Sequence, residues 1–148
     1  MKKTYSFCFG LSLMAALLTA CNGKNCGGNS CPAAPYFLVS LNDAQGRDLF
    51  NVATPAHYDT AVFNNLNKGV ARVGPSPFKQ NAFCIFSAIS PGSITLQLKI
   101  SATDVDTVVY NADMVKGCCP DYAMKSFSYN GVSYADSLAT RNFLVIKQ

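Results

Sequence analysis

One segment of the chain alternates strictly between apolar and polar side chains. The apolar positions are Ile94, Leu96, Leu98 and Ile100, and the polar ones are Thr95, Gln97, Lys99 and Ser101. Successive side chains of a β-strand point to opposite faces of the sheet. The pattern therefore predicts a strand with one face in a hydrophobic core and the other in water.

Further apolar runs, separated by turn-forming residues, predict the other strands. They cover residues 36–41, 82–89, 106–110, 122–129 and 141–147. The run at 82–89 is apolar on both faces, which is typical of a central, doubly covered strand. Asn130-Gly131 is a strong hairpin signal. About seven or eight short strands with frequent turns predict an all-β chain, a single β-sandwich of the immunoglobulin-like or transthyretin-like kind.

Residues 54–69 fit two different structures. Tyr58, Val62 and Leu66 keep the spacing of one helix face, which would make the segment a helix. The alternative is a strand that includes residues 61–63. We expect the strand.

The first 20 residues have the layout of a secretory signal peptide. Lys2 and Lys3 form a basic start, and an uncharged stretch follows with its apolar centre at residues 11–18. A membrane-spanning helix needs about 20 mainly apolar residues. The apolar run is shorter than that and is interrupted by hydroxyl side chains such as Ser12, so a cleaved signal is expected.

The signal ends in Leu18-Thr19-Ala20-Cys21, which resembles the lipobox of bacterial lipoproteins. The resemblance implies that residues 1–20 are removed and that Cys21 then carries acyl chains such as palmitate. Each buried CH₂ of such chains contributes about 0.8 kcal/mol, and two or more chains give a stable anchor. The cysteine is followed by Asn22 and not by Asp, so the resemblance favours the outer membrane over the inner. The alternative is an ordinary cleaved signal with a cysteine nearby.

The rest of the chain divides into a tether and one domain. Residues 21–35 are rich in turn formers and lack large apolar side chains, which predicts a lipidated flexible tether. Residues 36–148 are enough for one domain that buries roughly two-thirds of its unfolded surface.

The charge of the mature chain is nearly balanced. Without Lys2 and Lys3, ten basic residues face eight Asp, and there is no Glu. Nucleic-acid binders carry a basic stripe, and the sequence has no basic run, so a nucleic-acid partner is not expected. Membrane association is expected through the lipid on Cys21.

Five cysteines remain after Cys8 and Cys21 are set aside: Cys26, Cys31, Cys84, Cys118 and Cys119. Export to an oxidising compartment favours disulfides, and the odd number leaves one cysteine over. Adjacent Cα atoms are about 3.8 Å apart, below the usual disulfide range, so a bond within the 118–119 pair would be strained. The expected pairs are Cys84 with Cys118 or Cys119, and Cys26 with Cys31. Small buried thiols are the alternative.

The sequence offers little for catalysis or metal binding. His57 is the only histidine, and its pairing with a nucleophilic Cys84 is disfavoured because that cysteine lies in an apolar strand. Asp104 and Asp106 could share one strand face, and Asp43 and Asp48 share a loop, but Ca²⁺ needs six or more oxygen ligands. Solvated turn residues are the expected reading. No catalytic residue, metal or cofactor is predicted.

Aromatic residues gather in the C-terminal half of the chain. They are Tyr110, Tyr122, Phe127, Tyr129 and Tyr134. Outward tyrosines can stack on sugars or anchor a protein partner, although tyrosine is also a favoured strand residue. Tyr129 and Tyr134 flank the predicted hairpin and are the candidate binding surface.

Three short stretches carry a further resemblance. They are residues 43–50, residues 104–110, and the segment from Gly117-Cys118-Cys119-Pro120 to Asn130-Gly131. They resemble a group of small, mostly uncharacterised lipoproteins of Gram-negative bacteria. Phe50 stands where that pattern has Leu. The resemblance implies a β-sandwich on a lipid tether and brings no catalytic residue or ligand.

Together these observations predict a non-enzymatic lipoprotein of the bacterial cell envelope that acts as a binding or accessory module. Its partner could be an envelope protein or a glycan. The first alternative is an inhibitor of a secreted or host hydrolase that acts through the hairpin at Asn130-Gly131. The second is a thiol-redox protein that uses Cys118 and Cys119, although a redox pair normally has two residues between its cysteines.

Overall fold

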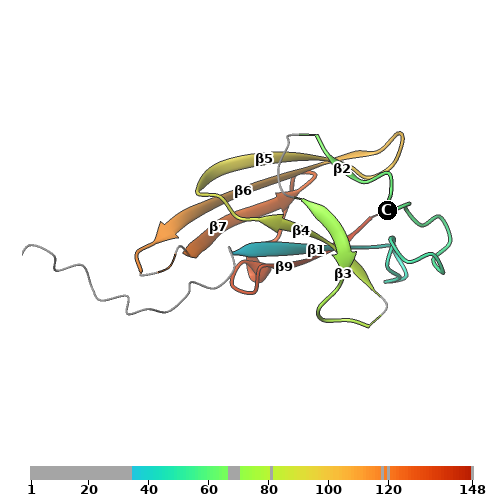
Figure 1. Cartoon of the computed structure of the whole chain (residues 1–148), viewed down its shortest axis with the longest axis horizontal. Coiled ribbons are helices and arrows are strands. Elements are labelled where there is room, and N and C mark those ends of the chain that lie inside the picture. The colour runs from blue at the N-terminus through green and yellow to red at the C-terminus, as the bar shows by residue number, and fades with distance from the viewer. Residues whose placement is uncertain (1–34, 67–70, 81, 118, 120, 148) are drawn as a thin grey trace, which may run out of the picture. The chain divides into compact units, whose positions relative to one another are not determined.

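The computed structural model describes residues 35–66, 71–80, 82–117, 119 and 121–147 (Figure 1). All of them belong to the compact unit Pro32–Gln148. The predicted signal peptide, the predicted tether up to residue 34, and Cys21, Cys26, Cys31 and Cys118 lie outside the described residues. In the part that is described, no helix is long and apolar enough to span a bilayer.

Two β-sheets make up the described fold. The strands are β1 (Tyr36–Asn42), β2 (Asn64–Asn65), β3 (Arg72–Pro75), β4 (Phe83–Ala88), β5 (Gly92–Lys99), β6 (Val105–Val115), β7 (Asp121–Tyr129), β8 (Val132–Ser133) and β9 (Asn142–Ile146), with a short 3₁₀ helix, η1 (Ala135–Ser137). One sheet has the order β3-β4-β1-β9 and the other β2-β5-β6-β7-β8. The first and last strands pair in parallel, and the remaining pairs are antiparallel. The predicted all-β sandwich is confirmed.

The alternating segment is the strand that its pattern predicts. Leu96, Leu98 and Ile100 are buried, whereas Thr95 and Gln97 are exposed. The buried side chains meet those of the other sheet in one continuous hydrophobic cluster. The two sheets are therefore held together mainly by the burial of their facing apolar sides.

Aromatic rings join the two sheets at the centre of this core. Phe37 of β1 packs edge-on against Tyr110 of β6 and Phe127 of β7. Phe127 is also stacked on Phe143 of β9, with ring centroids 3.6 Å apart. Tyr110 keeps its hydroxyl paired, because it accepts a hydrogen bond from the Ser90 backbone N–H at 3.1 Å. Aromatic contacts of this kind add to the stabilisation from burial alone.

The predicted hairpin between β7 and β8 is confirmed. Tyr129 pairs with Val132 across the turn. Asn130 and Gly131 both have positive φ, 47° and 81°. Two consecutive residues of this kind are what the two-residue turn matching the strand twist requires, and Asn-Gly meets that need with little strain.

The segment from residue 54 to 66 corrects a prediction. It forms neither a helix nor a strand at residues 61–63, and its only strand is β2. Local turns take its backbone groups instead: the Val62 N–H donates to the Asp59 carbonyl, and the Asp59 carboxylate accepts from the Ala61 N–H. Since Ala61 and Val62 are exposed, the segment has no alternating face to bury. The edge strand β3 was not expected from the sequence.

Candidate functional site

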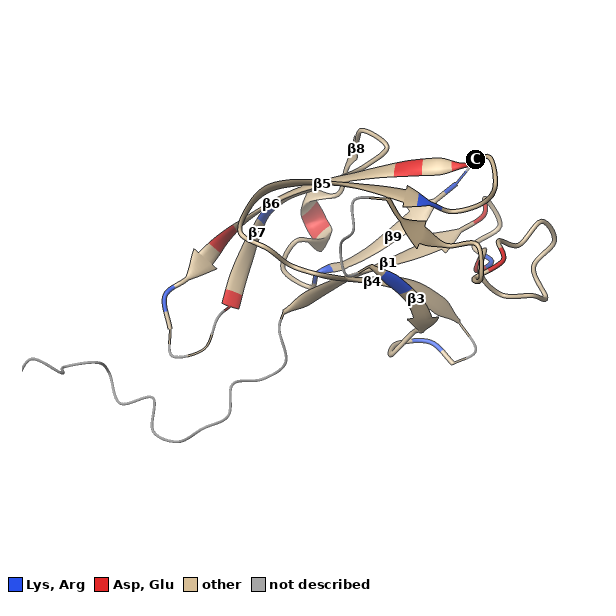
Figure 2. Ribbon diagram, turned by 45° about the horizontal axis from the view of Figure 1, so that its top comes forward, with Lys and Arg blue, Asp and Glu red and all other residues tan. Residues whose placement is uncertain are grey.

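The outer face of the four-stranded sheet is largely apolar, and its strands contain no acidic residue. By strand alternation it presents Tyr36 and Leu38 of β1, Phe86 of β4, and Leu144 and Ile146 of β9. No Asp occurs in β1, β3, β4 or β9, whereas β6 and β7 of the other sheet contain three (Figure 2). The opposite outer face presents polar side chains such as Thr95 and Gln97 together with the exposed Val105 and Val109. The two faces of the sandwich therefore differ most clearly in charge.

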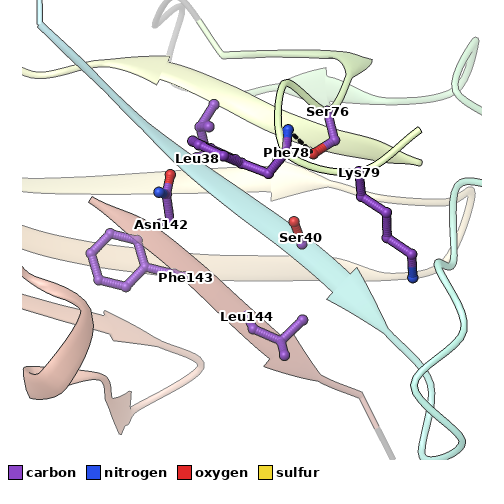
Figure 3. Close-up of a pocket in the computed structure, with 8 residues that line it drawn as sticks. All are labelled: Leu38, Ser40, Ser76, Phe78, Lys79, Asn142, Phe143 and Leu144. Atoms are coloured by element: carbon purple, nitrogen blue, oxygen red, sulfur yellow. Dashed lines mark hydrogen bonds between the residues drawn. The ribbon is translucent and has the colours of Figure 1, made fainter. Parts of the chain in front are cut away.

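A shallow groove runs over this apolar face. Its first part has a volume of about 220 Å³ and is lined by Leu38, Ser40, Ser76, Phe78, Lys79, Asn142, Phe143 and Leu144 (Figure 3). A second hollow of about 340 Å³ is lined by Pro35, Tyr36 and the segment 139–142, and it shares Leu38, Phe78 and Asn142 with the first. Because they share these residues, we treat both as one feature, the outer-face groove.

The connection between β3 and β4 forms one wall of the outer-face groove. Its base is closed by a hydrogen bond from the Ser76 N–H to the Ala82 carbonyl at 2.8 Å. Within the connection, the Phe78 N–H donates to the Ser76 hydroxyl at 3.3 Å. The Phe78 side chain is 70% exposed. The Phe78 ring is therefore largely in contact with water, on a loop whose base is closed by the hydrogen bond between Ser76 and Ala82.

Cationic side chains lie around the groove. Lys79 and Arg141 are among its lining residues, and the Arg72 guanidinium lies over the Phe86 ring at 5.7 Å. Arg141 is paired with Asp121 at 3.0 Å. Arg72 and Lys79 have no ion-pair partner among the described residues. The groove combines apolar side chains with the unpaired Lys79, and Arg72 lies next to it on the same sheet, which suits a ligand that has an apolar and an anionic part.

A second polar feature lies where β6 begins and β9 ends. The Lys147 ammonium donates to Asp104 at 2.5 Å and to Asp106 at 2.6 Å. Tyr58 donates to Asp104 at 3.0 Å, and Lys147 also lies over the Tyr58 ring. Asp106 is only 2% exposed and accepts further hydrogen bonds from Tyr129 and from the side chain of Asn130. We call this set of six residues the Lys147 cluster.

Asp104, Lys147 and Tyr129 of the Lys147 cluster are held in their ordinary charge states. Burial alone would raise the pKa of Asp104, but the hydrogen bond and charge of Lys147 and the hydroxyl of Tyr58 lower it below its usual value. Burial alone would lower the pKa of Lys147, and the two carboxylates raise it instead. Burial, followed by the hydrogen bond to Asp106, raises the pKa of Tyr129 strongly. None of these three groups titrates near neutral pH, so the cluster is a structural tie.

The carboxylates considered for metal binding are occupied by the protein itself. Asp104 and Asp106 do point to one side, as their spacing predicts, and both contact the Lys147 ammonium there. Asp43 accepts from two backbone N–H groups of its own loop and from the Arg47 side chain. Asp48 accepts from the Phe50 and Phe83 N–H groups. Over the described residues, no three His, Cys, Asp or Glu side chains group so as to hold a metal ion.

The predicted pairing of Cys84 with Cys118 or Cys119 is wrong. Cys84 is a free thiol with 0% exposure, whereas Cys119 is disulfide-bonded, so Cys84 is not its partner. Cys84 lies near the start of β4, opposite Gly74. Cys119 lies in the connection that follows β6. The end of β6 nearest this connection pairs with the start of β5, Ala112 with Gly92, and therefore lies near the far end of β4 from Cys84. The alternative prediction of a small buried thiol describes Cys84.

The histidine and thiol do not form a nucleophilic pair. Burial raises the pKa of Cys84 to about 11, although a hydrogen bond with Ser76 acts in the opposite direction. Thiolates are the reactive form of cysteine, so Cys84 is inert in the folded chain. His57 is exposed, and its ring contacts the Thr54 carbonyl at 3.2 Å.

The predicted tyrosine surface is also corrected. Tyr129 is only 2% exposed and contributes its ring to the core and its hydroxyl to Asp106. Tyr134 is partly buried and packs against Phe127 and Phe143. The tyrosines are drawn inward because β7 directs Phe127 and Tyr129 to the inner face of its sheet. The hairpin therefore does not offer the Tyr129 ring to a partner, and the Tyr134 ring is only partly accessible.

Sequence reasoning missed the residues that form the groove wall. Phe78 lies in Pro75-Ser76-Pro77-Phe78-Lys79, an aromatic residue among turn formers. A bulky apolar residue in such a loop does not belong to an alternating strand that would bury its side chain. Its place among turn formers could therefore have marked Phe78 as an exposed residue. Leu144 had no such signal, because it lies within the predicted final strand. A comparison with protein-family models, with curated proteins and with solved structures found no match to this chain.

Proposed function

We propose that this protein is a non-enzymatic lipoprotein of the bacterial cell envelope, anchored through acyl chains on Cys21. In this proposal the β-sandwich is a binding or accessory module that uses the outer-face groove. The observation that carries it is the exposed apolar face. Leu144, Ile146 and Tyr36 are about half exposed and Phe78 more so, and exposed apolar patches of this kind mark interaction surfaces.

Two further observations support a binding role. The groove residues include hydroxyl and amide groups at Ser40 and Asn142, which can orient a ligand on an otherwise apolar surface. The chain also enters the domain at this surface, because Pro35 and Tyr36 line the groove. A lipid anchor fourteen residues upstream of Pro35 keeps the groove close to the membrane that carries it.

The anchor is tested by metabolic labelling with an alkyne analogue of palmitate in bacteria that express the full chain. The wild type should be labelled, and Cys21→Ser should not. Cys26→Ser is the matched control, because it removes a neighbouring cysteine and should keep the label. Label that persists in Cys21→Ser would refute the assignment of the lipid to Cys21.

The binding role is tested by photo-crosslinking in intact cells from position 78. A photoreactive residue at Phe78 should give one dominant adduct, with an envelope protein, a glycan or a lipid. The same residue at Thr95, on the polar face, is the control and should give none. Equal, diffuse adducts from both positions would count against the groove as a binding surface.

A further inference from the structure

We propose that the outer face of the four-stranded sheet lies against the surface of an anionic phospholipid bilayer. In this arrangement the Phe78 ring enters the interface between headgroups and acyl chains, and Arg72 and Lys79 contact phosphate groups. The inference rests on the proposed lipid anchor, which brings the domain to the bilayer. It goes further by naming the face that meets the membrane and the chemistry of its partner.

The apolar side chains of this face are accessible to a partner. Phe78 lies on the connection between β3 and β4 and is 70% exposed. Tyr36, Leu144 and Ile146 flank the same sheet face and are about half exposed. A bilayer interface accommodates such side chains, and aromatic rings are favoured at headgroup level. Burying a Phe side chain is worth a factor of about 10 to 100 in partitioning.

The charge of this face fits a negative surface. Arg72 and Lys79 have no ion-pair partner among the described residues, and the four strands of the sheet contain no Asp. Each basic residue near an anionic bilayer increases binding by a factor of about five. Two such residues bind the bilayer weakly. The domain therefore needs an additional anchor to spend most of its time on the membrane.

The proposed anchor supplies that condition. Fourteen residues lie between Cys21 and Tyr36, and a flexible chain of that length spans about 20 Å root-mean-square. Linking a weak contact to an anchor makes the second binding event intramolecular and gives it a high effective concentration. Because Tyr36 lies on the proposed membrane face, the chain needs no path around the domain to reach the bilayer.

An extended peptide is the main competing occupant, because β9 is an edge strand. The geometry points to the bilayer for two reasons. The groove is shallow, and Phe78 in its wall is 70% exposed, so the wall does not form a closed slot for a peptide side chain. The two unpaired cations also lie near opposite ends of β3, Arg72 at its start and Lys79 in the connection that follows it, where both can contact a planar anionic surface.

The chain contains no tryptophan, so one introduced tryptophan reports its own depth. Phe78→Trp and, as matched control, Thr95→Trp are made in the full chain, and the acylated proteins are reconstituted into vesicles. The vesicles contain phosphatidylethanolamine and phosphatidylglycerol with brominated acyl chains, which quench buried tryptophan. Phe78→Trp should be blue-shifted and quenched, and Thr95→Trp should be neither. Adding Arg72→Gln and Lys79→Gln to Phe78→Trp should reduce the docked-to-undocked ratio about 25-fold.

The outcomes separate the inference from the proposed function. Acylated protein that sediments with the vesicles but leaves Phe78→Trp unquenched overturns membrane docking and leaves the anchor intact. Equal quenching in phosphatidylcholine vesicles overturns the role of the anionic lipid. If mass spectrometry finds no acyl chains on the protein, the anchor is refuted. Membrane docking is then tested with the same variants, without acyl chains, at high vesicle concentration. An unquenched Phe78→Trp under those conditions overturns membrane docking. A protein crosslinked at position 78 together with no quenching would identify the face as a protein-docking surface instead.

Discussion

Replacing Lys147 with methionine should lower the free energy of unfolding by about 2–4 kcal/mol. The substitution keeps most of the apolar stem and removes the ammonium that contacts Asp104 and Asp106. Breaking a buried ion pair from one side costs about 3–5 kcal/mol, because the remaining charge stays buried. Here that charge is Asp106, which is 2% exposed.

The expected loss lies toward the lower end of that range for two reasons. Asp106 keeps its hydrogen bonds from Tyr129 and Asn130. Asp104 is more exposed than Asp106, so water can solvate it when the ammonium is gone. The lost cation–π contact with Tyr58 adds about 0.5–1 kcal/mol at a partly exposed site.

Urea denaturation followed by far-UV circular dichroism measures the loss. Lys125→Met is the matched control, because Lys125 pairs with Asp113 at 3.6 Å on the surface and both side chains are mostly exposed. Exposed pairs contribute about 0–1 kcal/mol. In the Asp106→Asn background, Lys147→Met should cost at least about 1 kcal/mol less, because no buried charge is left behind. If Lys147→Met and Lys125→Met unfold at the same urea concentration with equal slopes, the reasoning is refuted.

The same cluster predicts a dependence on pH. The pKa of Asp104 is lower in the folded chain than its usual value, so the folded state binds fewer protons. This stabilisation is present above about pH 4, the ordinary Asp value, and is lost as the pH falls through the folded pKa. The raised pKa of Lys147 keeps its contribution complete below about pH 10, and that contribution is lost as the pH rises through the folded pKa. The Lys147→Met variant should show a weaker loss of stability on acidification than the wild type.

The thiol, the hairpin and the aromatic core allow three further tests. Cys84 should resist a thiol reagent such as Ellman's reagent in the native protein and react in denaturant, because burial raises its pKa to about 11; labelling of the native thiol at the denatured rate would contradict its burial. Gly131→Ala should destabilise the protein by about 1 kcal/mol in urea titration, since φ is 81° and no atom lies within 4 Å of the added Cβ; no change would mean that the turn relaxes without cost. Phe127→Ala should cost about 3–5 kcal/mol through loss of its stacking on Phe143 and the cavity left behind, and a cost below 1 kcal/mol would argue against close packing there.

Much of the fold could be predicted from short-range pattern. The alternation from Ile94 to Ile100 and the Asn130-Gly131 turn are local features, and both have the predicted structure. Residues 54–66 could not be predicted in this way. Their spacing fits a helix and a strand equally well, and turn hydrogen bonds such as those of Asp59 outcompete both.

The candidate site was predictable only in its parts. The spacing of Asp104 and Asp106 indicated that the two carboxylates could face the same side, but the partner Lys147 is 41 residues beyond Asp106 and is brought there by the pairing of β9 with β1. Tyr129 looked like a surface residue because a hairpin follows it, and its exposure depended on which face of β7 meets the other sheet. The apolar strand around Cys84 indicated that a thiolate is disfavoured there, but the expected disulfide of Cys84 was wrong, because the tertiary packing buries this cysteine as a free thiol.

By itself the sequence determined the kinds and positions of most strands, the turn at Asn130-Gly131 and the absence of a basic stripe, because these depend on neighbours along the chain. Only the tertiary structure decided which sheet face is exposed, where Phe78 stands and which groups surround Lys147. Those properties arise when residues far apart in the sequence are packed together, since burial and charge pairing depend on what the opposite sheet supplies.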